Sequence, residues 1–335
     1  MPSEPSLIPA EQTRQLFDPI VGQTQAVSLL LQAVTRERIA PGYLFVGPAG
    51  IGRSLVAEAF AALLLGHSGE SLDRLQRRIR SRNHPDLLWV EPTYLHQGRL
   101  LTVAEAQAAD VKRRGRPQVR LDQVREIARF LGRPPLESAR AVVVIESAEL
   151  IAEAAANGLL KTLEEPGQAT LVLMAPDQQT LLPTLISRCQ TIPFRRLGAT
   201  DLAQVLAQVG HAEILAHPEI LALAQGSPGS AIASWQQRQT IPPDLLQQLS
   251  QPISDLCRAL ELARHIAQTL TPESQLWLLD YLQQSRWHRG AQGMEQLELA
   301  RKQLLRYVQP RLVWEVTLMN LMESPGDSEI AGHRN

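Results

Sequence analysis

The chain has 335 residues, of which 44% are hydrophobic and 20% charged, and its formal net charge is −1. This length allows two or three domains, and the near-neutral charge excludes a uniformly basic nucleic-acid coat but not local basic patches. The two cysteines, Cys189 and Cys257, exclude a disulfide framework and a four-cysteine zinc site, which indicates a reducing cytoplasm.

The chain begins with polar and acidic residues, and it contains no run of 18 apolar residues, so we expect neither a signal peptide nor a membrane span. A turn at residues 17–23 precedes a helical pattern over 26–37 with its apolar residues on one face. The apolar run 43–46 predicts the first strand, and residues 54–65 predict a helix that ends at Gly66.

A glycine-rich loop, GPAGIGRS, joins that strand to that helix. Its spacing is that of G-x-x-x-x-G-K-[ST], in which backbone N–H groups and a helix N-terminus surround a phosphate. Arg53 replaces the lysine, and its planar guanidinium is wider than an ammonium group. We predict a degenerate nucleotide-binding loop formed by Gly47, Gly50, Gly52, Arg53 and Ser54, with a plain glycine-rich turn as the alternative.

The next segment, residues 67–83, is polar and rich in arginine, and a short apolar run at 87–90 predicts a strand. Residues 91–118 mix proline, glycine and charge, so we predict a mobile loop there. The arginines of 74–82 or the cations of 112–116 could contact DNA phosphates, although a solvated basic face is the more frequent meaning of such clusters.

Strand and helix patterns then alternate until about residue 195. The predicted elements are a helix at 121–131, a strand at 141–145, a helix at 152–165, a strand at 170–174, a short helix at 181–188 and a strand at 191–194. This alternation predicts an α/β fold with a doubly wound parallel sheet. Only helical patterns follow, and Trp277, Trp287 and Trp314 stand among leucines as core residues rather than as base-stacking platforms.

We therefore divide the chain into four parts. They are an α/β nucleotide-binding-type domain at 1–195, a small helical lid at 196–240, an all-α domain at 241–323 and a disordered tail at 324–335.

Taken together, the motifs resemble those of AAA+ proteins, and more closely those of bacterial clamp-loader subunits. Residues 17–23 are similar to the opening box of those subunits, and the sequence NGLLKTLEEP at 157–166 matches their N-[AG]-L-L-K-x-L-E-E-P helix. Residues 187–189 are their S-R-C motif, and residues 307–315 resemble the helical collar that joins the subunits in a ring. The resemblance covers about residues 17–320 and implies an AAA+ domain, a lid and a collar.

Against this family pattern, the residues that would hydrolyse ATP are altered. A hydrolysing member ends its second motif strand in Asp-Glu, for magnesium and for the attacking water, whereas this chain has Glu146 and Ser147 as a degenerate Walker B motif. Gly229 stands where a hydrolysing relative has a lid arginine, and Arg53 replaces the loop lysine. The resemblance thus implies a member without ATPase activity of its own.

Arg188 of the S-R-C motif is retained. The resemblance implies that this arginine acts in trans, on the γ-phosphate of ATP in a neighbouring subunit. A cation that neutralises the dipole at a helix C-terminus is the alternative. The prediction is a non-hydrolysing, stator-like clamp-loader subunit of the DNA polymerase III holoenzyme, acting in DNA replication.

The partners implied by this resemblance are delta and gamma or tau subunits, a sliding clamp and primer-template DNA, without a membrane. No cofactor is expected to be required, and weak binding of ATP or ADP stays open. Relatives commonly carry a four-cysteine zinc module before the His-Pro-Asp turn, but residues 65–84 contain no cysteine, so no zinc or other metal site is expected. An ATP-hydrolysing motor subunit and a nucleotide-sensing binding module are the alternatives.

Overall fold

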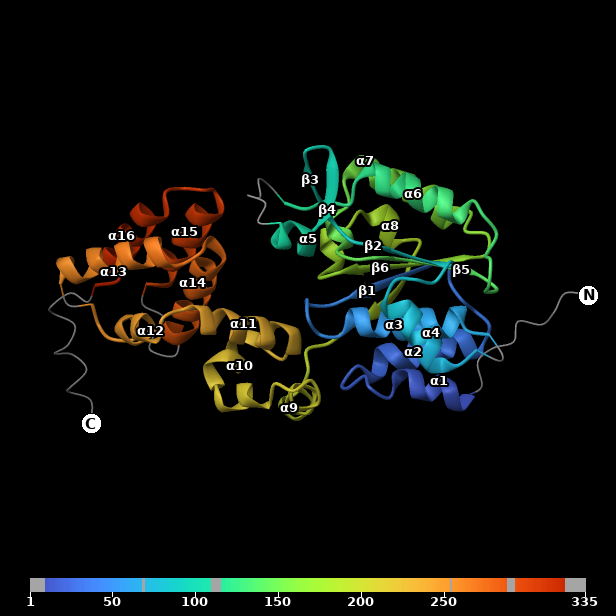
Figure 1. Ribbon diagram of the computed structural model, residues 1–335, viewed down its shortest axis with the longest axis horizontal. Helices are drawn as coiled ribbons and strands as arrows, with labels where there is room; N and C mark the ends of the chain where they lie inside the picture. Colours follow the sequence, from blue (N-terminus) through green and yellow to red (C-terminus); the bar gives the residue numbers. More distant parts are fainter. Residues whose placement is uncertain (1–9, 68–69, 110–115, 254, 288–292, 323–335) are drawn as a thin grey trace, which may run out of the picture. The chain divides into compact units, whose positions relative to one another are not determined.

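The computed structural model describes residues 10–67, 70–109, 116–253, 255–287 and 293–322. The chain forms two compact units, residues 1–205 and 206–335 (Figure 1). The predicted division between lid and collar falls inside the second unit and stays a prediction, and the predicted tail lies outside the described residues.

The strands of the first unit are β1 (Gly42–Val46), β2 (Leu87–Val90), β3 (Thr93–His96), β4 (Arg99–Thr102), β5 (Ala141–Ile145), β6 (Ala169–Ala175) and β7 (Gln190–Pro193). Its helices are α1 (Ala10–Phe17), α2 (Thr24–Thr35), α3 (Arg53–Leu65), α4 (Leu72–Arg80), α5 (Val103–Ala108), α6 (Leu121–Leu131), α7 (Glu153–Glu164) and α8 (Pro183–Ile186), with 3₁₀ turns at Ala148–Leu150 and Gln178–Thr180. Helix α9 (Ala199–Gln208) spans the boundary between the units.

Five parallel strands form the main sheet in the order β2-β5-β6-β1-β7. Successive side chains of a strand point to opposite faces, so the buried residues of β1 divide between two cores. Tyr43 and Phe45 belong to the core that includes residues of α1 to α4, whereas Leu44 belongs to the core that includes residues of α6 to α8. Helices cover both faces of the sheet (Figure 1), which confirms the predicted α/β class.

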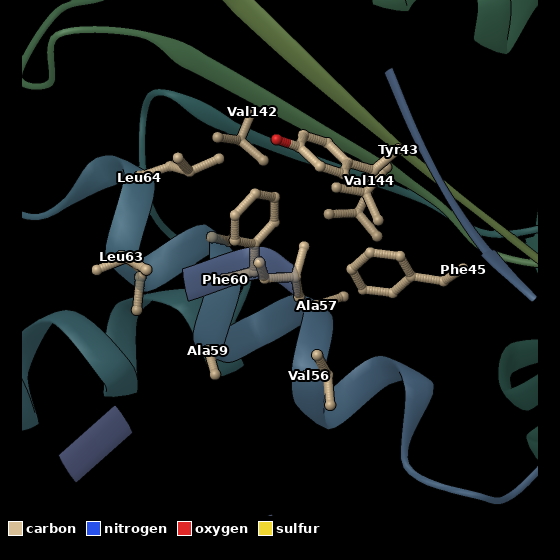
Figure 2. Close-up of a cluster of buried hydrophobic side chains, with 14 of the residues drawn as sticks. Tyr43, Phe45, Val56, Ala57, Ala59, Phe60, Leu63, Leu64, Val142 and Val144 are labelled. Carbon is tan, nitrogen blue, oxygen red and sulfur yellow. The ribbon is translucent and has the colours of Figure 1, made fainter. Parts of the chain in front are cut away.

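Aromatic packing fixes helix α3, which follows the glycine-rich loop, against the sheet. Figure 2 shows Phe60 of α3 among the side chains of Tyr43, Phe45 and Val142. The rings of Phe60 and Tyr43 meet edge to face, with their centroids 4.9 Å apart. This contact packs the middle of α3 against the start of β1, and so helps to position the helix that begins at the loop.

The prediction of a mobile loop over 91–118 is wrong for much of that segment. Strands β3 and β4 form an antiparallel hairpin, helix α5 follows it, and the backbones of Thr93 and Gln118 exchange two hydrogen bonds of 2.9 and 3.0 Å. Gln97 and Gly98 turn the hairpin with φ angles of 48° and 79°, the left-handed backbone of a two-residue hairpin turn. Of the cationic cluster at 112–116, only Arg116 lies within the described residues.

Besides α5, two further helices are absent from the sequence-based prediction. Helix α1 lies before the predicted turn, and helix α4 lies within the arginine-rich segment. In α4 only Leu75 and Ile79 are buried, one turn apart, and the arginines between them hide this short apolar stripe.

In the described part of the second unit every element is helical, as predicted. They are a 3₁₀ helix at Ala212–Ala216, α10 (Pro218–Ala224), α11 (Pro228–Thr240), α12 (Pro243–Leu249), α13 (Leu256–Thr269), α14 (Pro272–Trp287), α15 (Met294–Leu305) and α16 (Pro310–Asn320). Trp277 and Trp314 are buried, and the Trp314 indole donates a 2.9 Å hydrogen bond to Gln275, whereas the side chain of Trp287 lies outside the described part. None of the helices in the described residues is long and apolar enough to cross a membrane.

Candidate nucleotide site and arginine finger

The glycine-rich loop lies between the carboxyl end of β1 and the start of α3, in the predicted order. The N–H of Gly47 donates to the carbonyl of Ala175 at 3.1 Å, which ties the loop to the end of β6. A Cβ atom on Gly47 would lie 2.6 Å from the carbonyl oxygen of Phe194, so only glycine fits there. Gly50 and Gly52 have φ angles of 73° and 97°, in the left-handed region that favours glycine.

Gln23, the last residue of the predicted opening box, holds this loop in place through hydrogen bonds. Its buried side-chain amide donates to the carbonyls of Ile51 at 3.2 Å and Arg195 at 2.7 Å. Its Oε1 accepts from the N–H of Arg195 at 3.1 Å. The sequence analysis did not assign this role to Gln23, because its partners lie 28 and 172 residues away.

Arg53, at the lysine position, is half-buried at the first residue of α3. Burial lowers the pKa of Arg53, and the negative charges of Glu149 and Glu146 partly offset this effect. The Nη1 atom of Arg53 is buried without a hydrogen-bond partner among the described residues. Burial also raises the pKa of Glu149, against the opposite effect of Arg53. The loop therefore holds a partly desolvated cation close to two carboxylates.

The carboxylate of Glu146, at the position expected for a metal-binding aspartate, is already engaged. The indole N–H of Trp89, on β2, donates to Glu146 Oε1 at 2.8 Å. The Arg82 guanidinium lies over the Trp89 ring, 3.3 Å from its centroid, and pairs with Glu58 of α3 at 3.0 Å. Ser147 follows with a φ of 49° and carries no carboxylate. Contacts through Trp89 and Arg82 thus connect Glu146, at the end of β5, to Glu58 of α3.

Arg188 lies just after α8, with 35% of its side chain exposed. Its Nε and Nη2 atoms donate to Glu164 Oε1 at 3.0 and 2.6 Å. Its Nη1 atom donates to the carbonyl of Thr184 at 3.0 Å and to Ser187 Oγ at 3.4 Å. The structure thus brings together two of the predicted motifs, because Glu164 belongs to the LEEP segment at the end of α7.

Cys189 completes the S-R-C motif and packs inward. A Cβ atom at Gly42 would lie 2.8 Å from Cys189 Sγ, which shows how closely this turn approaches the start of β1. Burial raises the pKa of the Cys189 thiol to about 12.

At pH 8 only about one in 10⁴ Cys189 side chains is therefore a thiolate, the form that reacts with alkylating agents. We expect iodoacetamide to modify the exposed Cys257 and to spare Cys189 in the folded protein. Peptide mass spectrometry after alkylation checks this, and denatured protein, in which both thiols should react, is the control. Equal rates in the folded protein would contradict the partly buried position of Cys189.

Two further features of the predicted site belong to helices α11 and α4. Gly229 stands in the first turn of α11, where Ser227 Oγ accepts the N–H of Ser230 at 3.2 Å, and belongs to the second unit. Arg78, in the basic cluster at 74–82, is paired with Glu70 at 3.2 Å and Glu137 at 2.8 Å. The described residues contain no group of three His, Cys, Asp or Glu side chains that could hold a metal ion.

The parallel sheet with its strand order, the glycine-rich loop at the carboxyl end of β1 and the helical second unit together define an AAA+-type protein. A solved structure of a DNA polymerase III gamma subunit-related protein from Thermotoga maritima shows the same fold, with a TM-score of 0.52. The match covers 88% of this chain and 97% of that one at 15% identity, so it bears on the fold alone.

The family is given by the sequence. Residues 22–198 match the family model described as DNA polymerase III, delta subunit, and residues 200–321 match the model of the cyanobacterial DNA polymerase III delta prime C-terminal domain. The chain therefore belongs to the DNA polymerase III delta-subunit family of AAA+ clamp-loader proteins, with a C-terminal domain of the delta-prime type. This confirms the family predicted from the motifs.

Curated relatives agree with this assignment. The delta' subunit of Bacillus subtilis is 32% identical over 180 residues, which are 52% of this chain and 48% of that protein. The delta' subunit of Pseudomonas aeruginosa is 35% identical over 207 residues, which are 58% and 56% of the two chains. The chain thus spans about half the length of the curated relatives that it matches.

Proposed function

We propose that this chain is a non-hydrolysing, stator-like clamp-loader subunit that supplies Arg188 to the ATP of a neighbouring ATPase subunit. Its partners are delta and gamma or tau subunits, and the assembly loads a sliding clamp onto primer-template DNA in the cytoplasm. The subunit requires no cofactor of its own. The two relatives named above are delta' subunits of DNA polymerase III, which supports assembly with other subunits of that polymerase.

The observation that carries the proposal is the contrast between the end of β5 and the S-R-C turn. Glu146 accepts a hydrogen bond from Trp89, and Ser147 offers no carboxylate to activate water. Loss of such a general base costs about 10²- to 10⁴-fold in rate. Arg188, by contrast, keeps the planar guanidinium that binds phosphate well, and it lies at the protein surface.

The isolated protein is therefore expected to hydrolyse ATP no faster than a buffer blank. The test measures phosphate release by the purified chain, and then by the chain mixed with delta and gamma or tau subunits, with the stoichiometry of the complex determined in parallel. Appreciable turnover by the chain alone, abolished by Arg53→Ala, would instead favour the ATP-hydrolysing motor.

A nucleotide-sensing role is the second candidate, and the intact backbone of the loop favours it. Gly47, Gly50 and Gly52 keep the close approach and the left-handed angles of a phosphate loop, and Ser54 is present. Titration of the isolated chain with a fluorescent ATP analogue separates this role from an empty site. Saturable binding without hydrolysis would support it.

Assembly through the second unit is supported by a row of exposed apolar side chains. Leu312, Val316 and Met319 lie at helical spacing on α16 and are 52%, 40% and 37% exposed, and Tyr307 just before the helix is 77% exposed. The opposite face of α16, with Val313 and Trp314, is buried. An exposed apolar row of this kind is typical of a protein interface.

Replacing Leu312 and Val316 together by aspartate is expected to weaken incorporation into the loader by about tenfold or more, because truncated or charged interface anchors each cost about 1 kcal/mol or more. Co-purification with delta and gamma or tau subunits measures this effect. The control is Leu256→Asp at another exposed leucine, which is 49% exposed. Normal incorporation of the double variant would exclude this row from the interface.

A further inference from the structure

The resting contacts of Arg188 point to a second residue of the finger. All three guanidinium nitrogens donate hydrogen bonds within this chain: Nε and Nη2 to Glu164, and Nη1 to Thr184 and Ser187. The edge formed by Nε and Nη2 is one of the two that can bind a phosphate through two parallel hydrogen bonds, and Glu164 Oε1 occupies it.

We propose that Glu164 is a positioning residue that holds Arg188 in a stored conformation until the phosphate of a neighbouring ATP takes the place of its carboxylate. The inference rests on the proposed function, since it concerns the same finger. Carboxylate and phosphate present similar anionic oxygens to the same guanidinium edge, so they exclude each other there. Each time the finger binds a phosphate through this edge, the contact with Glu164 has to break.

The solvent exposure of the Arg188–Glu164 ion pair determines how strongly Glu164 competes with phosphate for the guanidinium. The side chains of Arg188 and Glu164 are 35% and 51% exposed, so water screens their attraction and replaces it readily. An exposed ion pair of this kind weakens the binding of a competing phosphate to Arg188 by about two- to fivefold. This is weak enough for phosphate to displace the carboxylate and strong enough to measure.

The test removes the charge of Glu164 and keeps its size. In the assembled loader with DNA, Glu164→Gln is expected to lower the apparent KM for ATP at the neighbouring site by about two- to fivefold, with kcat unchanged, because the finger is no longer held back. To isolate that site, the other ATPase subunits carry alanine in place of their phosphate-loop lysine. A merely structural role of Glu164 would lower kcat or the melting temperature instead.

Two further variants make the result specific. Glu165→Gln removes the same charge one position along, at another exposed residue, and should leave KM unchanged. In an Arg188→Ala background, Glu164→Gln should have no effect, because the carboxylate acts through that arginine.

Failure of the inference and failure of the proposed function look different in this experiment. If Arg188→Ala lowers turnover but Glu164→Gln leaves KM as it is, or lowers kcat, the role of Glu164 is overturned and the finger stands. If Arg188→Ala itself changes nothing, both are overturned.

Discussion

Replacing Arg188 by alanine is expected to lower ATP turnover at the neighbouring subunit's site by about 10³-fold or more. A guanidinium supplied in trans stabilises the charge that develops on the transferred phosphoryl group, and arginine fingers contribute about 10³ to 10⁵ in rate. The fold of this chain should not change, because Arg188 lies at the surface and its only ion pair among the described residues, with Glu164, is exposed. The loss is therefore expected in kcat and not in assembly.

The measurement is single-turnover ATP hydrolysis in a loader in which only the adjacent ATPase site is intact, since turnover at other sites would mask the loss. Arg125→Ala is the matched control, because Arg125 is another exposed, ion-paired arginine, 3.0 Å from Asp122. Arg188→Lys keeps the charge without the planar fork and should recover only part of the rate. Unchanged hydrolysis with Arg188→Ala would refute the finger, and the dipole-neutralising role would remain.

The conformation of the glycine-rich loop and the chemistry of ATP hydrolysis depend on different groups of the protein. The loop is held by backbone groups and by Gln23, whose side chain donates to the carbonyls of Ile51 and Arg195. The chemistry of hydrolysis would need particular side chains at the end of β5. There Glu146 accepts from Trp89 instead, as part of the packing between β2 and β5. Such a site can lose its reaction without losing its fold.

The main elements of the fold could be predicted because periodicity and β-branched runs are local signals. The run at 141–145 and the loop after residue 46 needed no knowledge of distant parts of the chain. The β3–β4 hairpin was missed although Gln97 and Gly98 carry a turn signal, because the strands on either side are only four residues long. Short strands next to charged residues give too little alternation to be distinguished from a loop.

The contacts within the site could not be predicted in this way. The sequence pattern indicates only that Trp89 is an apolar residue of a strand, and its hydrogen bond to Glu146 joins positions 57 residues apart. Glu164 belonged to a recognised motif, as did Arg188, but nothing in either motif indicates that the two side chains pair. Such pairs depend on how strands and helices lie side by side, which sequence spacing does not record.

The second large effect is expected on stability, from a substitution in the core between α3 and the sheet, which also contains Ile51 of the loop. Replacing Phe60 by alanine is expected to lower the free energy of unfolding of the first unit by about 4 kcal/mol, because the change removes a fully buried ring and leaves a cavity. The ring lies edge to face with Tyr43 and 6.5 Å from Phe45, so its loss also removes aromatic contacts with two positions of β1 (Figure 2). Phe60→Leu should cost less, since leucine refills part of the space.

Calorimetry of the full chain measures the effect, and hydrogen exchange locates it. The amides of β1 and β5 should lose protection in Phe60→Ala, while those of α13 and α16 in the second unit should keep it. Leu55→Ala on the same helix is the control, because Leu55 is 56% exposed and its loss should cost less than about 0.5 kcal/mol. Since α3 begins at the loop, a loss of protection that spreads to residues 47–52 would show that this core also holds the loop in shape, whereas an unchanged loop would assign that task to Gln23.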